Sequence, residues 1–176
     1  MVGEMRDIET AQIGIQASLT GHLVLSTVHT NSAVAAITRL RDMGIESFLL
    51  ASSLRTIISQ RLVRRLCLDC RYEDEPTNEV SKLFNLQNGQ KIYKSEGCNK
   101  CSNTGYQGRI AIAECIQVDK ALKEMIHNNS SETEISNYVF KDSQSIDQAS
   151  RDLLINGITS ADELIRVGNL KEDAEL

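Results

Sequence analysis

The chain has 176 residues, of which 41% are apolar and 24% charged, and a formal net charge of −5. These values are typical of a globular protein and exclude general disorder. The acidic balance, with 4% aromatic residues and no Trp, argues against a nucleic-acid binder, which needs a basic face or a stacking surface.

Residues 10–38 contain no Asp, Glu, Lys or Arg, and a stretch of that length can span a bilayer. The same stretch contains Gln12, Gln16 and Asn31, whose side chains are costly in hydrocarbon. We therefore expect interior α/β structure here and no direct membrane span. The first residues also lack the pattern of a signal peptide.

The first 65 residues alternate between helical and strand patterns. The predicted elements are a strand end at 1–3, a helix from Asp7 to about residue 19, an apolar strand at 23–28, a helix from Asn31 or Ser32 to Gly44, and a helix at 47–63. Capping residues, helical spacing and a terminal glycine support the helices. This order predicts a parallel α/β sheet.

The second half begins with a cysteine-rich segment at about 66–107 and continues with short elements. These are a strand at 109–116 that returns to the first sheet, a helix from Asp119 to His127, and helices opened by capping boxes at Ser131/Glu134, Ser145/Gln148 and Ser160/Glu163. Serine followed three residues later by Glu or Gln is a signature of a helix start. Gly157 and Gly168 end the last two helices, and the polar tail after them is expected to be frayed.

Four of the five cysteines form two Cys-x-x-Cys pairs, Cys67/Cys70 and Cys98/Cys101. Two such pairs are the usual ligand set of a tetrahedral structural zinc site, which has no open coordination position. A redox pair or unrelated thiols are the alternatives. The fifth, Cys115, lies in an apolar run and is expected to be a small buried side chain.

The order of several motifs resembles the secretion ATPases, the hexameric motors of type II secretion and type IV pilus assembly. The matching segments are GEMRD at 3–7, TGHLVLSTVHTNSA at 20–33, RLRDMGIESFLL at 39–50, QRLVRRLC at 60–67, the two Cys pairs, TGYQGR at 104–109 and GITSADELIRV at 157–167. The wording of several of them favours the type II secretion branch over the pilus branch.

The resemblance implies a role for four residues near the start of the chain. Glu4 corresponds to the Walker-B-type glutamate that polarises the attacking water, whereas the residue taken by itself is more simply an acid at a helix start. His22 and His29 belong to the family's histidine box, which senses the γ-phosphate of the nucleotide. Arg6 is a further nucleotide-site candidate, with holding the loop preferred over touching phosphate.

The family's phosphate loop, Gly-x4-Gly-Lys-Ser/Thr, does not occur in the sequence, since no glycine is followed directly by a lysine. The resemblance therefore implies an α/β fold that is the C-terminal half of a RecA-like ATPase domain. Its expected parts are a partial ATPase core (1–65), a tetracysteine zinc subdomain (66–108), and a return strand with a helical C-terminal extension (109–176).

Two classes of function follow. The first is part of a hexameric cytoplasmic motor, peripheral to the bacterial inner membrane, that uses ATP and Mg²⁺, carries structural Zn²⁺ and contacts the membrane secretion platform. The 176 residues alone are then expected to be inactive. The second is a non-enzymatic, zinc-stabilised interaction module. Arginines around the first Cys pair serve either as counter-charge to a zinc–thiolate site or as a contact for a partner.

Overall fold

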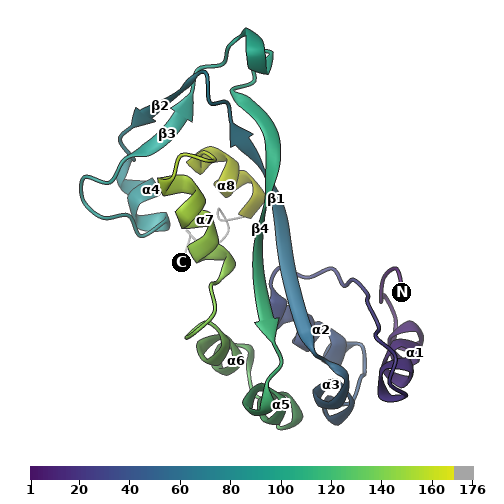
Figure 1. Ribbon diagram of the computed structural model, residues 1–176. Helices are drawn as coiled ribbons and strands as arrows, with labels where there is room; N and C mark the ends of the chain where they lie inside the picture. Colours follow the sequence, from purple (N-terminus) through teal and green to yellow (C-terminus); the bar gives the residue numbers. More distant parts are fainter. Residues whose placement is uncertain (169–176) are drawn as a thin grey trace. The chain divides into compact units, whose positions relative to one another are not determined.

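The computed structural model describes residues 1–168 and divides the chain into two compact units (Figure 1). The first unit comprises Met1–Ser59 and Glu114–Gln144, and the second Gln60–Ala113 and Ser145–Leu176. Two of the three boundaries fall within long strands, β1 (Thr56–Leu66) and β4 (Tyr106–Gln117), which pair with each other as a two-stranded sheet.

The first unit is built mainly from helices. They are α1 (Ile8–Leu19), α2 (Ala33–Asp42), α3 (Ser47–Ser53), α5 (Lys120–His127) and α6 (Glu132–Val139). Helix α3 packs against α1 and α5, and α2 packs against α6. The core between them includes Ile37, Leu50, Leu122 and Ile126, all fully buried.

Local capping chemistry explains where these helices start. The carboxylate of Asp7 accepts a hydrogen bond from the Thr10 N–H at 2.8 Å, and Ser32 caps α2 in the same way. Asp119 caps α5, and Ser131 forms the expected capping box with Glu134. The predicted starts of these four helices are confirmed, since each depends on side chains within one turn of the helix.

The prediction of a buried parallel strand at 23–28 is wrong. The segment is extended and accepts backbone hydrogen bonds from the first residues, Val2 N–H to Leu25 O and Met5 N–H to Thr27 O, each 2.9 Å. Neither stretch forms a regular strand, and Leu23 and Leu25 are 83% and 59% exposed. Burial of a parallel strand requires cover on both of its faces, and the described residues do not supply it.

The predicted helix at 47–63 is also wrong, because it ends at Ser53 and the chain then forms strand β1. Leu54 is extended, with φ −65° and ψ 134°. The apolar spacing fitted a helix, but β-branched Thr56, Ile57 and Ile58 favour a strand. Strand β4 supplies the pairing partner, in place of the predicted return of β4 to a first sheet.

The second unit holds a small sheet, short helices and the cysteine-rich segment. Its further elements are β2 (Arg71–Asp74), α4 (Asn78–Leu83), β3 (Ile92–Ser95), the 3₁₀ turn η1 (Asn99–Cys101), α7 (Ile146–Ile155) and α8 (Ala161–Gly168). Strands β2 and β3 are antiparallel, with Arg71 opposite Ser95. Val63, Ile92, Ile112 and Leu154 belong to the core of this unit.

The last two helices follow the prediction in part. Ser145 and Gln148 form the expected capping box, and Gly157 adopts φ 64° after α7. At α8 only half of the box is present, because Ser160 Oγ accepts the Glu163 N–H while the Glu163 carboxylate turns to arginines. The predicted polar tail lies outside the described residues.

Strand β4 alternates between buried and exposed side chains. Ile112, Glu114 and Ile116 are buried, whereas Cys115 is exposed. The prediction of a buried Cys115 is therefore wrong, since successive side chains of a strand point to opposite faces and the inward register here belongs to its neighbours.

Across residues 1–168, no helix combines the length and the apolar character needed to cross a bilayer.

Candidate functional site

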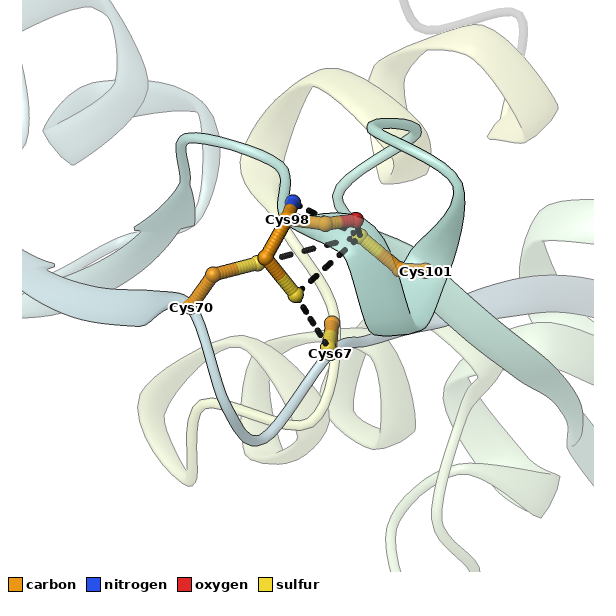
Figure 2. Close-up of side chains that lie close together, drawn as sticks. All are labelled: Cys67, Cys70, Cys98 and Cys101. Carbon is orange, nitrogen blue, oxygen red and sulfur yellow. Dashed lines mark hydrogen bonds between the residues drawn. The ribbon is translucent and has the colours of Figure 1, made fainter.

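The four paired cysteines converge in the second unit (Figure 2). All four Sγ atoms lie within 4.8 Å of one another. The Sγ atoms of Cys67 and Cys98 are 3.9 Å apart, those of Cys70 and Cys101 3.9 Å, and those of Cys98 and Cys101 3.8 Å. Four sulfurs at about 2.3 Å from a tetrahedral zinc would be about 3.8 Å apart, so the cluster has the dimensions of a metal site.

Two turns of the backbone present these sulfurs. Cys67 and Cys70 lie in the connection between β1 and β2, where the Arg71 N–H donates to Cys67 O at 3.0 Å. In the second pair, Cys98 caps η1 and Cys101 is its last residue, directly before the left-handed residues Ser102 and Asn103. Gly97 allows this tight turn, because a Cβ there would lie 2.7 Å from the backbone oxygen of Asn103.

The thiols of the cluster differ in acidity. Burial raises the pKa of Cys70 to about 12. Burial also raises the pKa of Cys101, but the backbone N–H groups of Cys98 and Gly105, each 3.2 Å from its Sγ, outweigh burial and lower that pKa to about 6. The thiolate is the metal-binding form, so Cys101 is ready to bind near neutral pH.

In the first unit, the structure brings together three of the four predicted nucleotide-site residues. Arg6 Nε and Nη2 each lie 2.6 Å from Glu4 Oε2. His29 Nε2 lies 3.2 Å from the other carboxylate oxygen of Glu4, although its side chain is 88% exposed. Glu4 thus has a cation on one oxygen and an imidazole on the other.

His22 lies apart from this group. Its Nδ1 is 3.1 Å from Thr20 Oγ1 in the turn after α1. The structure therefore separates the two histidines that the sequence grouped together, and only His29 contacts Glu4.

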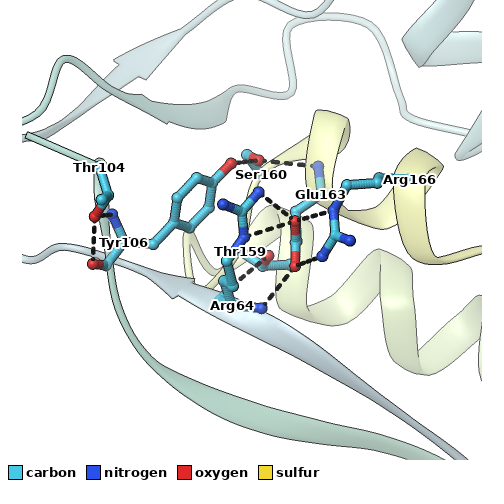
Figure 3. Close-up of polar contacts among 7 residues, drawn as sticks. All are labelled: Arg64, Thr104, Tyr106, Thr159, Ser160, Glu163 and Arg166. Atoms are coloured by element: carbon cyan, nitrogen blue, oxygen red, sulfur yellow. Dashed lines mark hydrogen bonds and ion pairs between the residues drawn. The ribbon is translucent and has the colours of Figure 1, made fainter.

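The sequence did not reveal a buried ionic network around Glu163 (Figure 3). The Glu163 side chain has no solvent exposure and binds the guanidinium groups of Arg64 and Arg166, with the closest contacts at 2.7 Å. Burial opposes ionisation, but the two arginines and the Arg64 backbone N–H lower the Glu163 pKa to about 2. The Arg64 guanidinium also stacks over the Tyr106 ring at 4.0 Å.

Comparison with known proteins indicates the same family as the motifs. A family model described as Type II/IV secretion system protein matches residues 1–166. The Type II secretion system ATPase E of Vibrio cholerae is 50% identical over 95% of the chain, and the putative type II secretion system protein E of Escherichia coli K12 is 48% identical over 99%. The chain spans only 34% and 36% of those relatives.

Solved structures of related fold were also found. The pilus retraction motor PilT with bound ADP matches with a TM-score of 0.61 and 24% identity, covering 93% of this chain and 37% of PilT. The ATPase DotB of Yersinia pseudotuberculosis matches with a TM-score of 0.64 and 19% identity, covering 97% and 36%. These matches confirm the predicted α/β fold class. The four-cysteine cluster agrees with the cysteine-rich segment that was expected within this fold.

Proposed function

The chain belongs to the type II/IV secretion system protein family, and from this premise we propose that it is part of an ATP-hydrolysing motor that powers type II protein secretion. The observation that carries the proposal is the contact of Glu4 with His29 in the first unit. It joins residues of two family motifs that lie 25 positions apart in the sequence, and it places an imidazole on a carboxylate that is only 21% exposed.

In this proposal Glu4 is the catalytic residue. A carboxylate that orients the attacking water must keep its charge and its direction. The bond from Arg6 holds one oxygen of Glu4, which supports the loop-holding role of Arg6 over a phosphate contact. His29, which contacts Glu4, is then the histidine that senses the nucleotide. Any contribution of His22 comes from the turn in which it contacts Thr20.

The four-cysteine cluster holds structural Zn²⁺ in this proposal. The sulfur separations fit a tetrahedral ion, and four thiolates leave no position for a substrate. The metal would fix the ends of β1 and β3 at the start of β4. It supplies folding free energy to the second unit, while ATP and Mg²⁺ act elsewhere in the motor.

The motor subunit is expected to act in the cytoplasm as one member of a hexameric ring, at the secretion platform of the bacterial inner membrane. Family membership and the names of the V. cholerae and E. coli relatives support the assignment to type II secretion; the ring and its place at the membrane follow from the motif resemblance. Type IV pilus assembly is the second candidate, because secretion and pilus motors share the motifs of this sequence; the match to PilT shows a shared fold alone. The higher identity to secretion proteins makes it the weaker one.

A hybrid protein tests the proposal. In it, this chain replaces the matching third of the V. cholerae secretion ATPase E, and a strain lacking its own ATPase produces the hybrid. We expect the hybrid to restore protein secretion and the Glu4→Gln hybrid to fail at equal abundance. Restored secretion by both proteins would instead support the non-enzymatic interaction module. Rescue of a pilus-assembly mutant alone would support the pilus alternative.

A further inference from the structure

Glu114 is a buried carboxylate on an otherwise apolar face of a strand. On β4 it lies between Ile112 and Ile116, and the exposed fractions of the three residues are 3%, 2% and 1%. Burial of a carboxylate is costly unless specific partners compensate for the lost water. A glutamate at this position therefore requires a partner inside the first unit.

That partner is the start of helix α2. Glu114 Oε1 accepts a hydrogen bond from the backbone N–H of Ala33, the first residue of α2, at 2.7 Å. The N-terminus of a helix has unpaired N–H groups and a positive dipole end, which both favour a carboxylate. Ser32 Oγ takes the Ala35 N–H at 3.0 Å, so the two side chains together hold the first turn of α2.

The histidine that contacts Glu4 lies directly before this anchored turn. Three residues separate His29 from Ala33 along the chain, and Thr30 Oγ1 donates to Ser32 O at 3.0 Å within that segment. Most of the His29 side chain is in solvent, so packing contributes little to its position. The backbone that carries His29 must set the 3.2 Å distance from its Nε2 to Glu4 Oε1.

We infer that Glu114 is a positioning residue for His29: it fixes the N-terminus of α2 from strand β4 and thereby holds the segment 29–33 in the place that lets the imidazole reach Glu4. The geometric part of this inference concerns the chain alone. Its importance for turnover rests on the proposed function.

Ring NMR signals of histidine test the geometric part on the 176-residue chain. The sequence has three histidines, so the ring spectrum is simple to assign. The Glu4→Gln variant is measured first, because it gives the ring chemical shifts of His29 in the absence of the Glu4 carboxylate. We expect Glu114→Ala to move the His29 signals toward those positions and Glu114→Gln, which keeps the acceptor oxygen, to leave them near the wild-type positions. The signals of His22, which contacts Thr20, should stay unchanged in both.

Asp119→Ala is the matched control. Asp119 also accepts a backbone N–H at a helix start, from Leu122 at 2.8 Å in the same unit, but α5 does not lead to His29. Its loss should lower stability without moving the His29 signals. If Glu114→Ala does not fold, Glu114→Asp replaces it, because the shorter side chain keeps the charge and loses the reach.

Unmoved His29 signals in the folded Glu114 variant, or equal movement in Asp119→Ala, would overturn the inference. A failure of both Glu114→Ala and Glu114→Asp to fold would also overturn it, since Glu114 would then be needed for the stability of the whole first unit. In the hybrid motor, Glu114→Ala should lower kcat by up to about 10²-fold, as misplaced groups do, with little change in KM for ATP. A moved His29 signal without any change in kcat would leave the positioning intact and contradict the role of His29 in the proposed function instead.

Discussion

Glu163 keeps its negative charge although its side chain is excluded from solvent. Arg64 and Arg166 each donate from two nitrogens to the carboxylate, and the Arg64 N–H adds a backbone bond. Charge-assisted bonds of this kind compensate for desolvation when the lone pairs of the carboxylate are occupied. The network ties α8 to β1 within the second unit.

The low pKa of Glu163 predicts a dependence of stability on pH. A carboxyl with a folded pKa of about 2 and an ordinary value of 4.5 stabilises the fold above pH 4.5 and loses this contribution as the pH falls toward 2. The difference corresponds to at most about 3 kcal/mol. Glu163→Gln should therefore lower the urea-unfolding free energy clearly at pH 7 and progressively less below pH 4.5.

An exposed carboxylate provides the control for this experiment. Glu73 pairs with Lys91 at 3.0 Å with both side chains more than half exposed, and such exposed pairs contribute little to stability. Glu73→Gln should hardly change the unfolding free energy at pH 7. An equal loss in the two variants, or a Glu163→Gln deficit that does not shrink on acidification, would show that the network is not stabilising.

At the scale of elements, the predictability of each one follows from the range of the contacts that form it. Asp7, Ser131 and Ser145 act within one helical turn, so their helices could be recognised from neighbouring letters. Strand β1 forms against β4, far away in sequence, and the same apolar spacing fits a helix when that partner is unknown. The Cys-x-x-Cys spacing predicted the four-cysteine cluster because its members come in local pairs.

Side chains that find distant partners escaped prediction for the same reason. Glu163 reads as the third residue of a capping box, yet two arginines take its carboxylate. Glu114 lies in a run of apolar letters, and only the register of β4 shows that it points inward at α2. Glu4 was found through a motif resemblance, whereas its contact with His29 required the fold.

The tetracysteine cluster predicts that the purified chain binds about one zinc ion per molecule. Cys98→Ser should lose the metal, because three sulfurs and one hydroxyl make a poor tetrahedral set. Cys115→Ser is the matched control, since this thiol is exposed on β4 and lies outside the cluster. Elemental analysis of protein prepared without chelator measures both. Metal retained in Cys98→Ser, or lost in Cys115→Ser, would contradict the ligand assignment.

Zinc removal should act on one unit more than on the other. The ligands fix the chain between β1 and β4, and metal binding is coupled to the folding of such segments. After chelation we expect faster amide hydrogen exchange in residues 66–107 and little change in α2 and α3. Mass spectrometry of exchanged peptides measures the difference, and uniform acceleration across both units would refute a local role for the metal.

At the scale of the whole molecule, we predict that the 176-residue chain does not hydrolyse ATP by itself. Backbone N–H groups and the lysine of a phosphate loop supply much of the binding for the nucleotide phosphates, and the sequence contains no such loop. Magnesium-dependent phosphate release by the pure chain, at a rate that Glu4→Gln abolishes, would reveal a phosphate site of another kind.

If Glu4 activates water in the assembled motor, as we propose, removing its charge should stop turnover without weakening nucleotide binding. In the hybrid with the V. cholerae ATPase, turnover and nucleotide affinity are measured on the same rings with Glu4 and with Glu4→Gln. The amide keeps the size of the side chain but lacks the charge. We expect Glu4→Gln to lower turnover by about 10²–10⁴-fold, as the loss of one general base does, and to leave nucleotide affinity unchanged. Near-normal turnover, or a joint loss of binding and turnover, would contradict it.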